Sequence, residues 1–290
     1  DCGSVRELME LYKQTLDYFM GLQVETEHIN DEIHIQQDIN AFRSSLVYDC
    51  IERAMDLVEG GSVYSADGGP TAGTISAGDS LAALDEIVFN QKLLTMEQVL
   101  HAMSTNYEDM ETVPAGPEIR AILLNKAPKF GNDDERADKW VVELEDYIGS
   151  SYRYKYRSSK YGKGPVPCCY SYSQSPVTGN ALLLGRALDA TPDGRKAGQP
   201  VNNGISPANG SEKKGATAAC NSVMKLPSIW FQKGAIFNMR LSKGALDTDE
   251  NKEKVIAMIK VLFETTDSRS SLMWWITRCS RRQWSIRMNI

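Results

Sequence analysis

The residues best suited to chemistry lie in an irregular segment at residues 190–226, ATPDGRKAGQPVNNGISPANGSEKKGATAACNSVMKL. Its TPDGR sequence at 191–195 predicts a turn, because proline fixes φ, aspartate can bond its own backbone and glycine tolerates positive φ. Ordered loops of this length inside a globular chain usually carry function. Asp193 and Arg195 are therefore candidate site residues that could form an ion pair, although turn formation alone accounts for them almost as well.

Four further polar residues are candidates for lining a substrate cavity. Tyr172, Ser173 and Ser175 lie at and beyond the end of an apolar run, PVPCCYSY at 165–172, which is typical of a buried strand. Their hydroxyl groups either face the cavity or are core groups satisfied by hydrogen bonds. Lys225 either approaches the rim of the cavity or is solvated at the end of a strand.

Cysteines, histidines and one aspartate give weaker signals. The six cysteines show no C-x-x-C spacing and the three histidines are scattered, so no metal site is predicted. Cys168 and Cys169 are adjacent, and we expect a buried pair on a core strand in preference to a reactive thiol. Asp79 and Ser80 are expected to cap a helix that begins there.

Composition limits the classes of function. With 290 residues, 42% of them hydrophobic, the chain can bury a sizeable core. A net charge of −6, with no basic run interleaved with aromatic residues, argues against nucleic-acid binding. No apolar run is long enough to span a bilayer and no signal peptide opens the chain, so we expect a cytoplasmic protein with reduced thiols.

Periodicity predicts helices that alternate with a few short strands, which indicates an α/β layered or barrel architecture. A capping box at Ser4 opens the first helix, and Gly21 is expected to end it. A second capping box is expected at Thr95 and Gln98. The other helices are expected near residues 46–58, 137–148 and 255–263 and from Ser80 onward, and the strands at 165–172 and 235–241.

Three groups of motifs resemble the glycyl radical enzyme family, also called the pyruvate formate-lyase family. The first is PDGR at 192–195, followed by SP at 206–207 and SVMKL at 222–226. Residues 44–84 and PKFGNDD at 128–134 match further family segments in the same order. The resemblance implies a ten-stranded α/β barrel built as two five-stranded halves. Residues 1–264 are then expected to form much of the second half, as a fragment of a longer enzyme.

The resemblance also implies a reaction. In this family a backbone glycyl radical, installed by a radical S-adenosylmethionine iron–sulfur activating enzyme, generates a cysteine thiyl that takes hydrogen from a small organic substrate. Neither the radical glycine nor the thiyl cysteine can be assigned, so no catalytic residue and no bound cofactor are predicted and the fragment is expected to be inactive alone. The full-length protein is expected to be an anaerobic homodimer. Its reaction would be that of a lyase, dehydratase, decarboxylase or formate C-acetyltransferase.

Residues 265–290 differ in composition from the rest of the chain. They hold three of the five tryptophans, five arginines and one acidic residue. Shifting the reading frame by one base turns the codons of MWWI at 273–276 into Val-Val-Asp, which matches the family pattern after the preceding helix. We therefore expect a frameshifted, non-native tail, with a natural basic arm as the alternative.

Two other classes of protein compete with the enzyme interpretation. The sequence GSEKKGAT at 210–217 is close to a nucleotide-binding P-loop, but Ala216 stands where the phosphate-binding lysine is required. A non-catalytic scaffold would suit the helices, but it would leave the loops rich in glycine, proline and asparagine unexplained.

Overall fold

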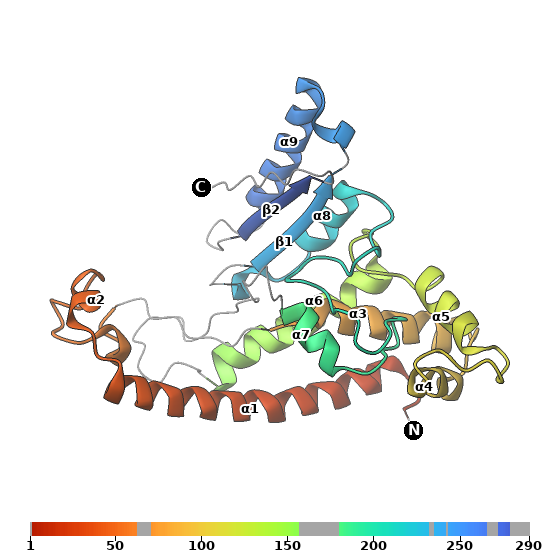
Figure 1. The fold of residues 1–290 in the computed structure, drawn as a ribbon, viewed down its shortest axis with the longest axis horizontal. Coiled ribbons are helices and arrows are strands. Elements are labelled where there is room, and N and C mark those ends of the chain that lie inside the picture. The colour runs from red at the N-terminus through yellow and green to blue at the C-terminus, as the bar shows by residue number, and fades with distance from the viewer. Residues whose placement is uncertain are drawn as a thin grey trace.

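The computed structural model describes residues 2–62, 71–156, 180–231, 235–241, 243–265 and 272–278. Helices dominate this part of the chain, and its two strands lie near the C-terminal end (Figure 1). The α-helices are α1 (Val5–Gln37), α2 (Ala41–Ser45), α3 (Thr74–Ala83), α4 (Met96–Ser104), α5 (Gly116–Asn125), α6 (Glu135–Ser150), α7 (Asn180–Ala187), α8 (Ala216–Met224) and α9 (Asp249–Thr265). The strands are β1 (Ala235–Leu241) and β2 (Leu272–Arg278).

Helix α1 begins as predicted, with the Ser4 side chain accepting a hydrogen bond from the Glu7 amide. The prediction that it ends at Gly21 is wrong, because the helix continues to Gln37. An interior glycine costs only about 1 kcal/mol relative to alanine. Burial of Met20 and Val24 on either side of it offsets that cost. Figure 1 shows α1 running along one edge of the molecule, beside α6.

The predicted helix at 46–58 is also wrong. Asp49 and Ala54 have positive φ, which a continuous helix cannot accommodate. The Asp56 carboxylate instead accepts hydrogen bonds from the Asn40 amide, the Ser44 hydroxyl and the Val58 amide, and so closes a turn-rich segment. These local polar bonds outweigh the helical spacing of the apolar residues.

The other predicted helices are present, with one shifted start. Helix α3 begins at Thr74 rather than at Ser80, so Asp79 lies inside the helix and does not cap it. The capping box of Thr95 and Gln98 at the start of α4 is confirmed. Helices α6 and α9 contain the stripes predicted at 137–148 and 255–263.

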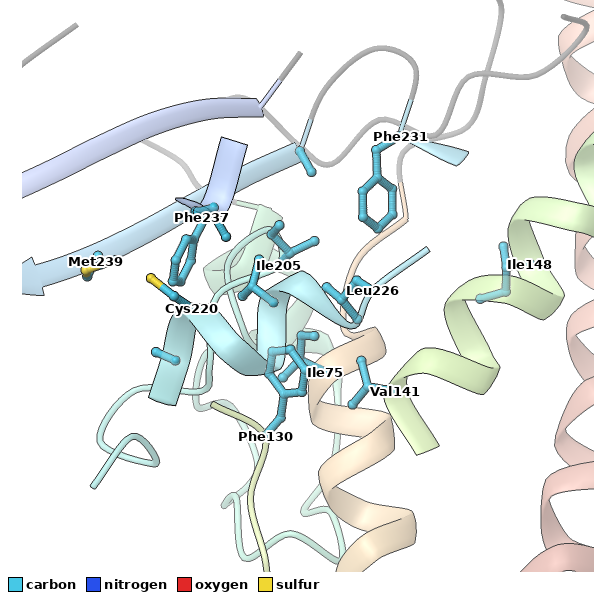
Figure 2. Packing of buried hydrophobic residues seen from close by; sticks show 14 of the residues in the cluster. Ile75, Phe130, Val141, Ile148, Ile205, Cys220, Leu226, Phe231, Phe237 and Met239 are labelled. Atoms are coloured by element: carbon cyan, nitrogen blue, oxygen red, sulfur yellow. The ribbon is translucent and has the colours of Figure 1, made fainter. Parts of the chain in front are cut away.

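Helices α3 and α6 pack closely because Gly78 lies against Val141. A Cβ atom added at Gly78 would stand 2.3 Å from Val141 Cγ2, so a larger residue cannot occupy this position without moving one helix. One core cluster surrounds this contact and extends to α8 and β1, as Figure 2 shows for Ile75, Phe130, Val141, Cys220 and Phe237. A second cluster joins the start of α1 to α3, α4, α5 and α6.

Strand β1 occupies the predicted residues 235–241 and pairs in parallel with β2. Two hydrogen bonds join β1 to the loop before α8. The Ile205 amide donates to Ile236 O at 2.9 Å, and the Asn238 amide donates to Ser206 Oγ at 2.7 Å. Two strands are present in the described residues, so the ten strands of the expected barrel are not visible there. Strand β2 falls in the segment expected to be non-native, and the origin of that segment stays a prediction.

Candidate functional site

A cavity of about 550 Å³ lies where four segments of the described chain meet. Helix α3, helix α5, the turn at 191–195 and the loop at 208–213 supply most of its wall. The lining residues are Ser76, Asp79, Arg120, Leu124, Asn125, Lys129, Asp193, Gly194, Arg195, Gln199, Pro200, Ala208, Asn209, Gly210, Ser211 and Lys213. Two of the predicted site residues, Asp193 and Arg195, are among them.

The turn at 191–195 forms as the sequence predicts. The Gly194 amide donates to Thr191 O and the Thr191 amide donates to Arg195 O, each at 3.0 Å. Gly194 has a φ of 91°, in the left-handed region that favours glycine. A Cβ atom at Gly194 would also approach Leu124 Cγ to 2.9 Å, so the turn is closely fitted to helix α5.

The expectation of an ion pair between Asp193 and Arg195 is wrong. The Asp193 carboxylate accepts hydrogen bonds from the Thr191 hydroxyl and the Arg195 amide. The Arg195 guanidinium is only 7% exposed and donates to main-chain carbonyl groups, including Gln199 O at 2.7 Å and Lys196 O at 3.2 Å. Arg195 therefore holds the loop together through its planar array of donors, and turn formation is the role that its contacts support.

Asp79 is the most unusual residue in the cavity wall. It is fully buried, and its Oδ1 accepts a hydrogen bond of 2.7 Å from the Phe130 amide while its Oδ2 has no hydrogen-bond partner in the described part of the chain. Burial raises the pKa of this carboxyl from 3.8 to about 7; Lys129 opposes the rise, while Asp193 and Asp138 add to it. The Asp79 carboxyl therefore titrates much closer to neutral pH than an exposed aspartate does.

Besides Arg195, three cationic side chains line the cavity above this carboxyl. Lys129 is 7% exposed and its Nζ donates to Asp193 O at 2.7 Å. Arg120 donates from Nε to Gly194 O at 2.9 Å, and its two terminal nitrogens make no hydrogen bond to the described residues. The Lys213 ammonium makes none there either. Main-chain carbonyls therefore accept some of the hydrogen bonds that these cations can donate, and the remaining N–H groups have no acceptor among the described residues.

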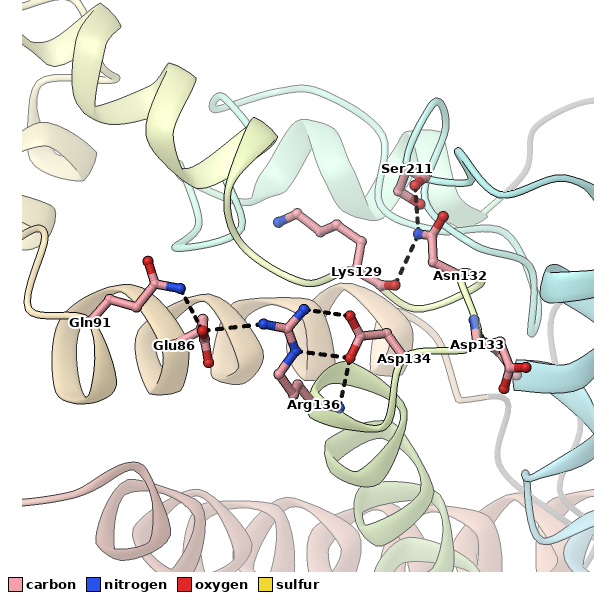
Figure 3. Close-up of polar contacts among 9 residues, drawn as sticks. Glu86, Gln91, Lys129, Asn132, Asp133, Asp134, Arg136 and Ser211 are labelled. Atoms are coloured by element: carbon pink, nitrogen blue, oxygen red, sulfur yellow. Dashed lines mark hydrogen bonds and ion pairs between the residues drawn. The ribbon is translucent and has the colours of Figure 1, made fainter.

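Asn132 fixes the relative positions of two loops that form the wall. Figure 3 shows its side chain between Lys129 and Ser211. Its Nδ2 donates to Lys129 O at 3.0 Å and to Ser211 O at 2.8 Å, and its Oδ1 accepts from the amides of Lys213 and Lys214. A single buried amide that satisfies four main-chain groups gives the cavity a defined shape.

Lys225 does not line this cavity. The expectation that it lies at a strand end is wrong, and its approach to the rim of a substrate cavity stays a prediction. It follows the last residue of α8, and its ammonium contacts Asp138 Oδ2 at 2.7 Å and Asp133 Oδ1 at 2.9 Å. The Ser222 hydroxyl donates to the same Asp138 oxygen at 3.0 Å. The two hydrogen bonds and the charge of the lysine oppose the effect of burial, which still raises the pKa of Asp138.

Other predicted residues fall outside the described residues or carry no reactive signal. Tyr172, Ser173 and Ser175 lie outside the described residues, as do Cys168 and Cys169. Within the described residues, no group of three or more His, Cys, Asp or Glu side chains is placed to hold a metal ion. Cys220 is buried on α8, and desolvation raises the pKa of its thiol to about 11, so this thiol stays protonated.

Asp79, Lys129 and Arg120 are not predicted from the sequence to be parts of one site. A signal for Asp79 was present, because it stands in an apolar stretch of helix where a charged residue is uncommon unless it is paired. No comparable signal existed for Lys129 and Arg120, which reach the cavity from separate elements.

Two family models match the chain in succession. The model described as pyruvate formate lyase-like matches residues 1–179, and the model described as glycine radical matches residues 201–271. The chain belongs to the pyruvate formate lyase-like family of glycyl radical enzymes. This membership removes the support for a nucleotide-binding protein, and residues 202–215, which precede α8, contain no strand that would lead into a P-loop.

Relatives of this glycyl radical enzyme chain include several dehydratases. The probable dehydratase YbiW of Escherichia coli is 32% identical over 259 residues, which cover 89% of the chain and 31% of the relative. Trans-4-hydroxy-L-proline dehydratase of Clostridioides difficile is 29% identical over 264 residues, or 90% of the chain and 31% of the relative. The glycerol-bound B12-independent glycerol dehydratase of Clostridium butyricum superposes with a TM-score of 0.81 at 28% identity, covering 97% of the chain and 33% of that structure.

The chain thus spans about a third of the length of the relatives it matches. The similarity to the glycerol dehydratase structure shows that the described part of the chain shares the fold of about a third of that enzyme. The expected α/β barrel is not confirmed by the described residues, which contain one two-stranded sheet. None of the helices described here is both long enough and apolar enough to cross a membrane.

Proposed function

We propose that the chain is part of a glycyl radical dehydratase that eliminates water from a small hydroxylated substrate. The family match carries this proposal, because the pyruvate formate lyase-like and glycine radical models follow one another along the chain. The relatives named above support one reaction type. Both curated relatives and the superposed structure named above are dehydratases, which favours elimination over the formate C-acetyltransferase reaction also expected from the resemblance.

The described residues contribute a scaffold to this chemistry. Radical intermediates must be kept from water and oxygen, so the reacting atoms need a rigid and closed surrounding. The paired cores, the tight contact of Gly78 with Val141 and the loop held by Arg195 supply rigid elements of that kind. No described residue is assigned the hydrogen abstraction, and the chain by itself is proposed to be inactive.

The partners in this proposal are a radical S-adenosylmethionine activating enzyme, a second copy of the full-length protein and the substrate. The protein is proposed to act in the cytoplasm under anaerobic conditions. The glycyl radical is the cofactor, and when it is formed it supplies hydrogen-atom abstraction that acid–base groups cannot perform on an unactivated C–H bond.

The test is anaerobic activation of the whole protein encoded by the gene that contains this chain. Incubation with an activating enzyme and S-adenosylmethionine should give the doublet of a glycyl radical in electron paramagnetic resonance. The activated protein should then dehydrate at least one of glycerol, propane-1,2-diol and trans-4-hydroxy-L-proline. The 290-residue chain treated identically should give neither signal nor product. A whole protein without the doublet would contradict the proposal, and a doublet with turnover of pyruvate to formate would contradict the dehydratase assignment.

A further inference from the structure

The cavity lined by Asp79, Arg120, Lys129 and Lys213 has no role in the function proposed above. It is distinct in character from the apolar cores, because both signs of charge meet in it. We propose that this cavity binds a small oxyanion, such as a sulfonate, carboxylate or sulfate group, and that the charge on Asp79 makes the binding pH-dependent.

Unused donors support an anionic ligand. The terminal guanidinium nitrogens of Arg120 and the ammonium of Lys213 have no partners in the described chain, and the single recorded hydrogen bond of Lys129 Nζ, to Asp193 O, leaves two of its protons unused. These cations come from α5, the loop after it and the loop at 208–213, so they approach the cavity from different sides. Charge-assisted hydrogen bonds from arginine and lysine are the usual means of holding carboxylate, sulfonate or phosphate oxygens.

The volume and the construction of the wall favour a specific ligand over loosely associated ions. About 550 Å³ accommodates a small organic anion as well as an inorganic one. The Arg195 guanidinium and the Asn132 amide, both buried, fix the loops that carry the donors. The main chain of these loops is therefore held in place before a ligand arrives, which reduces the entropy lost on binding.

Asp79 supplies the dependence on pH. The charged or titratable groups around it are Lys129 from the loop after α5, Asp193 from the turn and Asp138 from α6. Its Oδ2 lacks a hydrogen-bond donor in the described residues, so ionisation places a negative charge beneath the cavity that only the nearby charge of Lys129 and the Phe130 amide oppose among the groups named here. That charge repels an anion. With the carboxyl pKa raised by burial to about 7, acidification from pH 8 to pH 6 removes most of the repulsion.

The test uses the 290-residue chain and sodium sulfate as the probe, because sulfate keeps two negative charges throughout this pH range. Isothermal titration calorimetry at constant ionic strength, balanced with chloride, should show saturable binding that is about tenfold tighter at pH 6 than at pH 8. In Asp79→Asn the affinity should be nearly the same at both pH values and equal to that of the wild type at pH 6. Asparagine keeps an acceptor for the Phe130 amide, so the helix contact survives.

Two matched variants distinguish a cavity site from general charge attraction. Lys213→Gln removes an exposed lysine of the cavity wall and should weaken sulfate binding several-fold at pH 6. Lys126→Gln removes the same charge from an exposed lysine that does not line the cavity, and it should leave the affinity unchanged. Acetate and methanesulfonate, tested in the same way, identify which oxyanion the cavity prefers.

Three results would overturn the proposal. They are an absence of saturable sulfate binding at pH 6, equal losses of affinity in Lys213→Gln and Lys126→Gln, and the same pH dependence in Asp79→Asn as in the wild type. Binding is measured without activation, S-adenosylmethionine or turnover, so its outcome is independent of whether the whole protein is a dehydratase.

Discussion

Asp79 and Asp138 are both fully buried aspartates, but the structure treats their charges differently. Asp138 Oδ2 lies 2.7 Å from the Lys225 ammonium and accepts a hydrogen bond from Ser222. Asp79 has only a main-chain amide on one oxygen. The second carboxyl oxygen of each residue lacks a hydrogen bond in the described chain, so the ammonium beside Asp138 is what distinguishes the two. Burial raises the pKa of both carboxyls, and the pKa of Asp79 reaches about 7.

The difference indicates that Asp138 stabilises the fold, whereas Asp79 can respond to a bound ligand. A buried carboxylate beside an ammonium ion is stabilised in its charged form by that partner. A buried carboxylate without such a partner changes its charge near neutral pH and responds to whatever binds beside it. The two residues lie on α3 and α6, which pack against each other. Variants of either residue therefore test the stability of the same part of the structure.

The largest expected effect is on the pH dependence of stability, through Asp79→Asn. Below pH 3.8, the pKa of this carboxyl in the unfolded chain, Asp79 is protonated in both the folded and the unfolded state. Its burial then carries no penalty for a buried charge. As the pH rises toward about 7 the unfolded chain loses its proton first, so the wild type loses stability. The variant should therefore gain about 4 kcal/mol relative to the wild type between pH 4 and pH 8. Urea unfolding followed by circular dichroism across this range measures the gap, and a constant gap would show that Asp79 ionises normally.

The second effect comes from removing the partner of Asp138. Lys225→Met leaves that carboxylate buried without its counter-ion, and the free energy of unfolding should fall by about 3 kcal/mol at pH 7. Lys252→Met, which removes an exposed lysine paired with Asp249, serves as the control and should cost less than about 0.5 kcal/mol. Equal losses in the two variants would mean that Asp138 does not depend on Lys225.

A smaller effect is expected from the turn that forms one wall of the cavity. Gly194→Ala places a side chain at a φ of 91° and 2.9 Å from Leu124 Cγ, and it should cost about 2 kcal/mol. Gly198→Ala meets no atom within 4 Å at a φ of 75°, so only the backbone strain of about 1 kcal/mol remains. Thermal unfolding of both variants separates the contact with α5 from the conformational cost. A larger loss in Gly198→Ala would argue against the close fit.

The sequence predicted those helices and strands that begin with a capping box or show a regular apolar pattern. The capping boxes at Ser4 and Thr95, the stripe of α6 and the strand at 235–241 are all present. Helical spacing failed at 46–58, where the Asp56 carboxylate closes turns that periodicity does not reveal. Gly21 failed as a helix end because burial of its neighbours outweighs its low propensity.

The site was less predictable because its residues come together only in three dimensions. The turn at 191–195 was readable from proline, aspartate and glycine in sequence. The position of Asp79 beneath the cavity depends on the packing of α3 against the loop after α5, which no local pattern encodes. Lys225 was wrongly expected at a strand end for the same reason, since its carboxylate partners Asp133 and Asp138 lie just before and within α6, more than eighty residues earlier.

The most direct test of the contrast is the titration of Asp79 itself. Carbon-13 magnetic resonance of the aspartate carboxyl groups in the wild-type chain, assigned with Asp79→Asn, gives its pKa without any assumption about ligands. A midpoint near pH 7 that moves higher when sulfate is added would support both the uncompensated carboxyl and the anion site. A midpoint near pH 4 that is insensitive to sulfate would contradict the account.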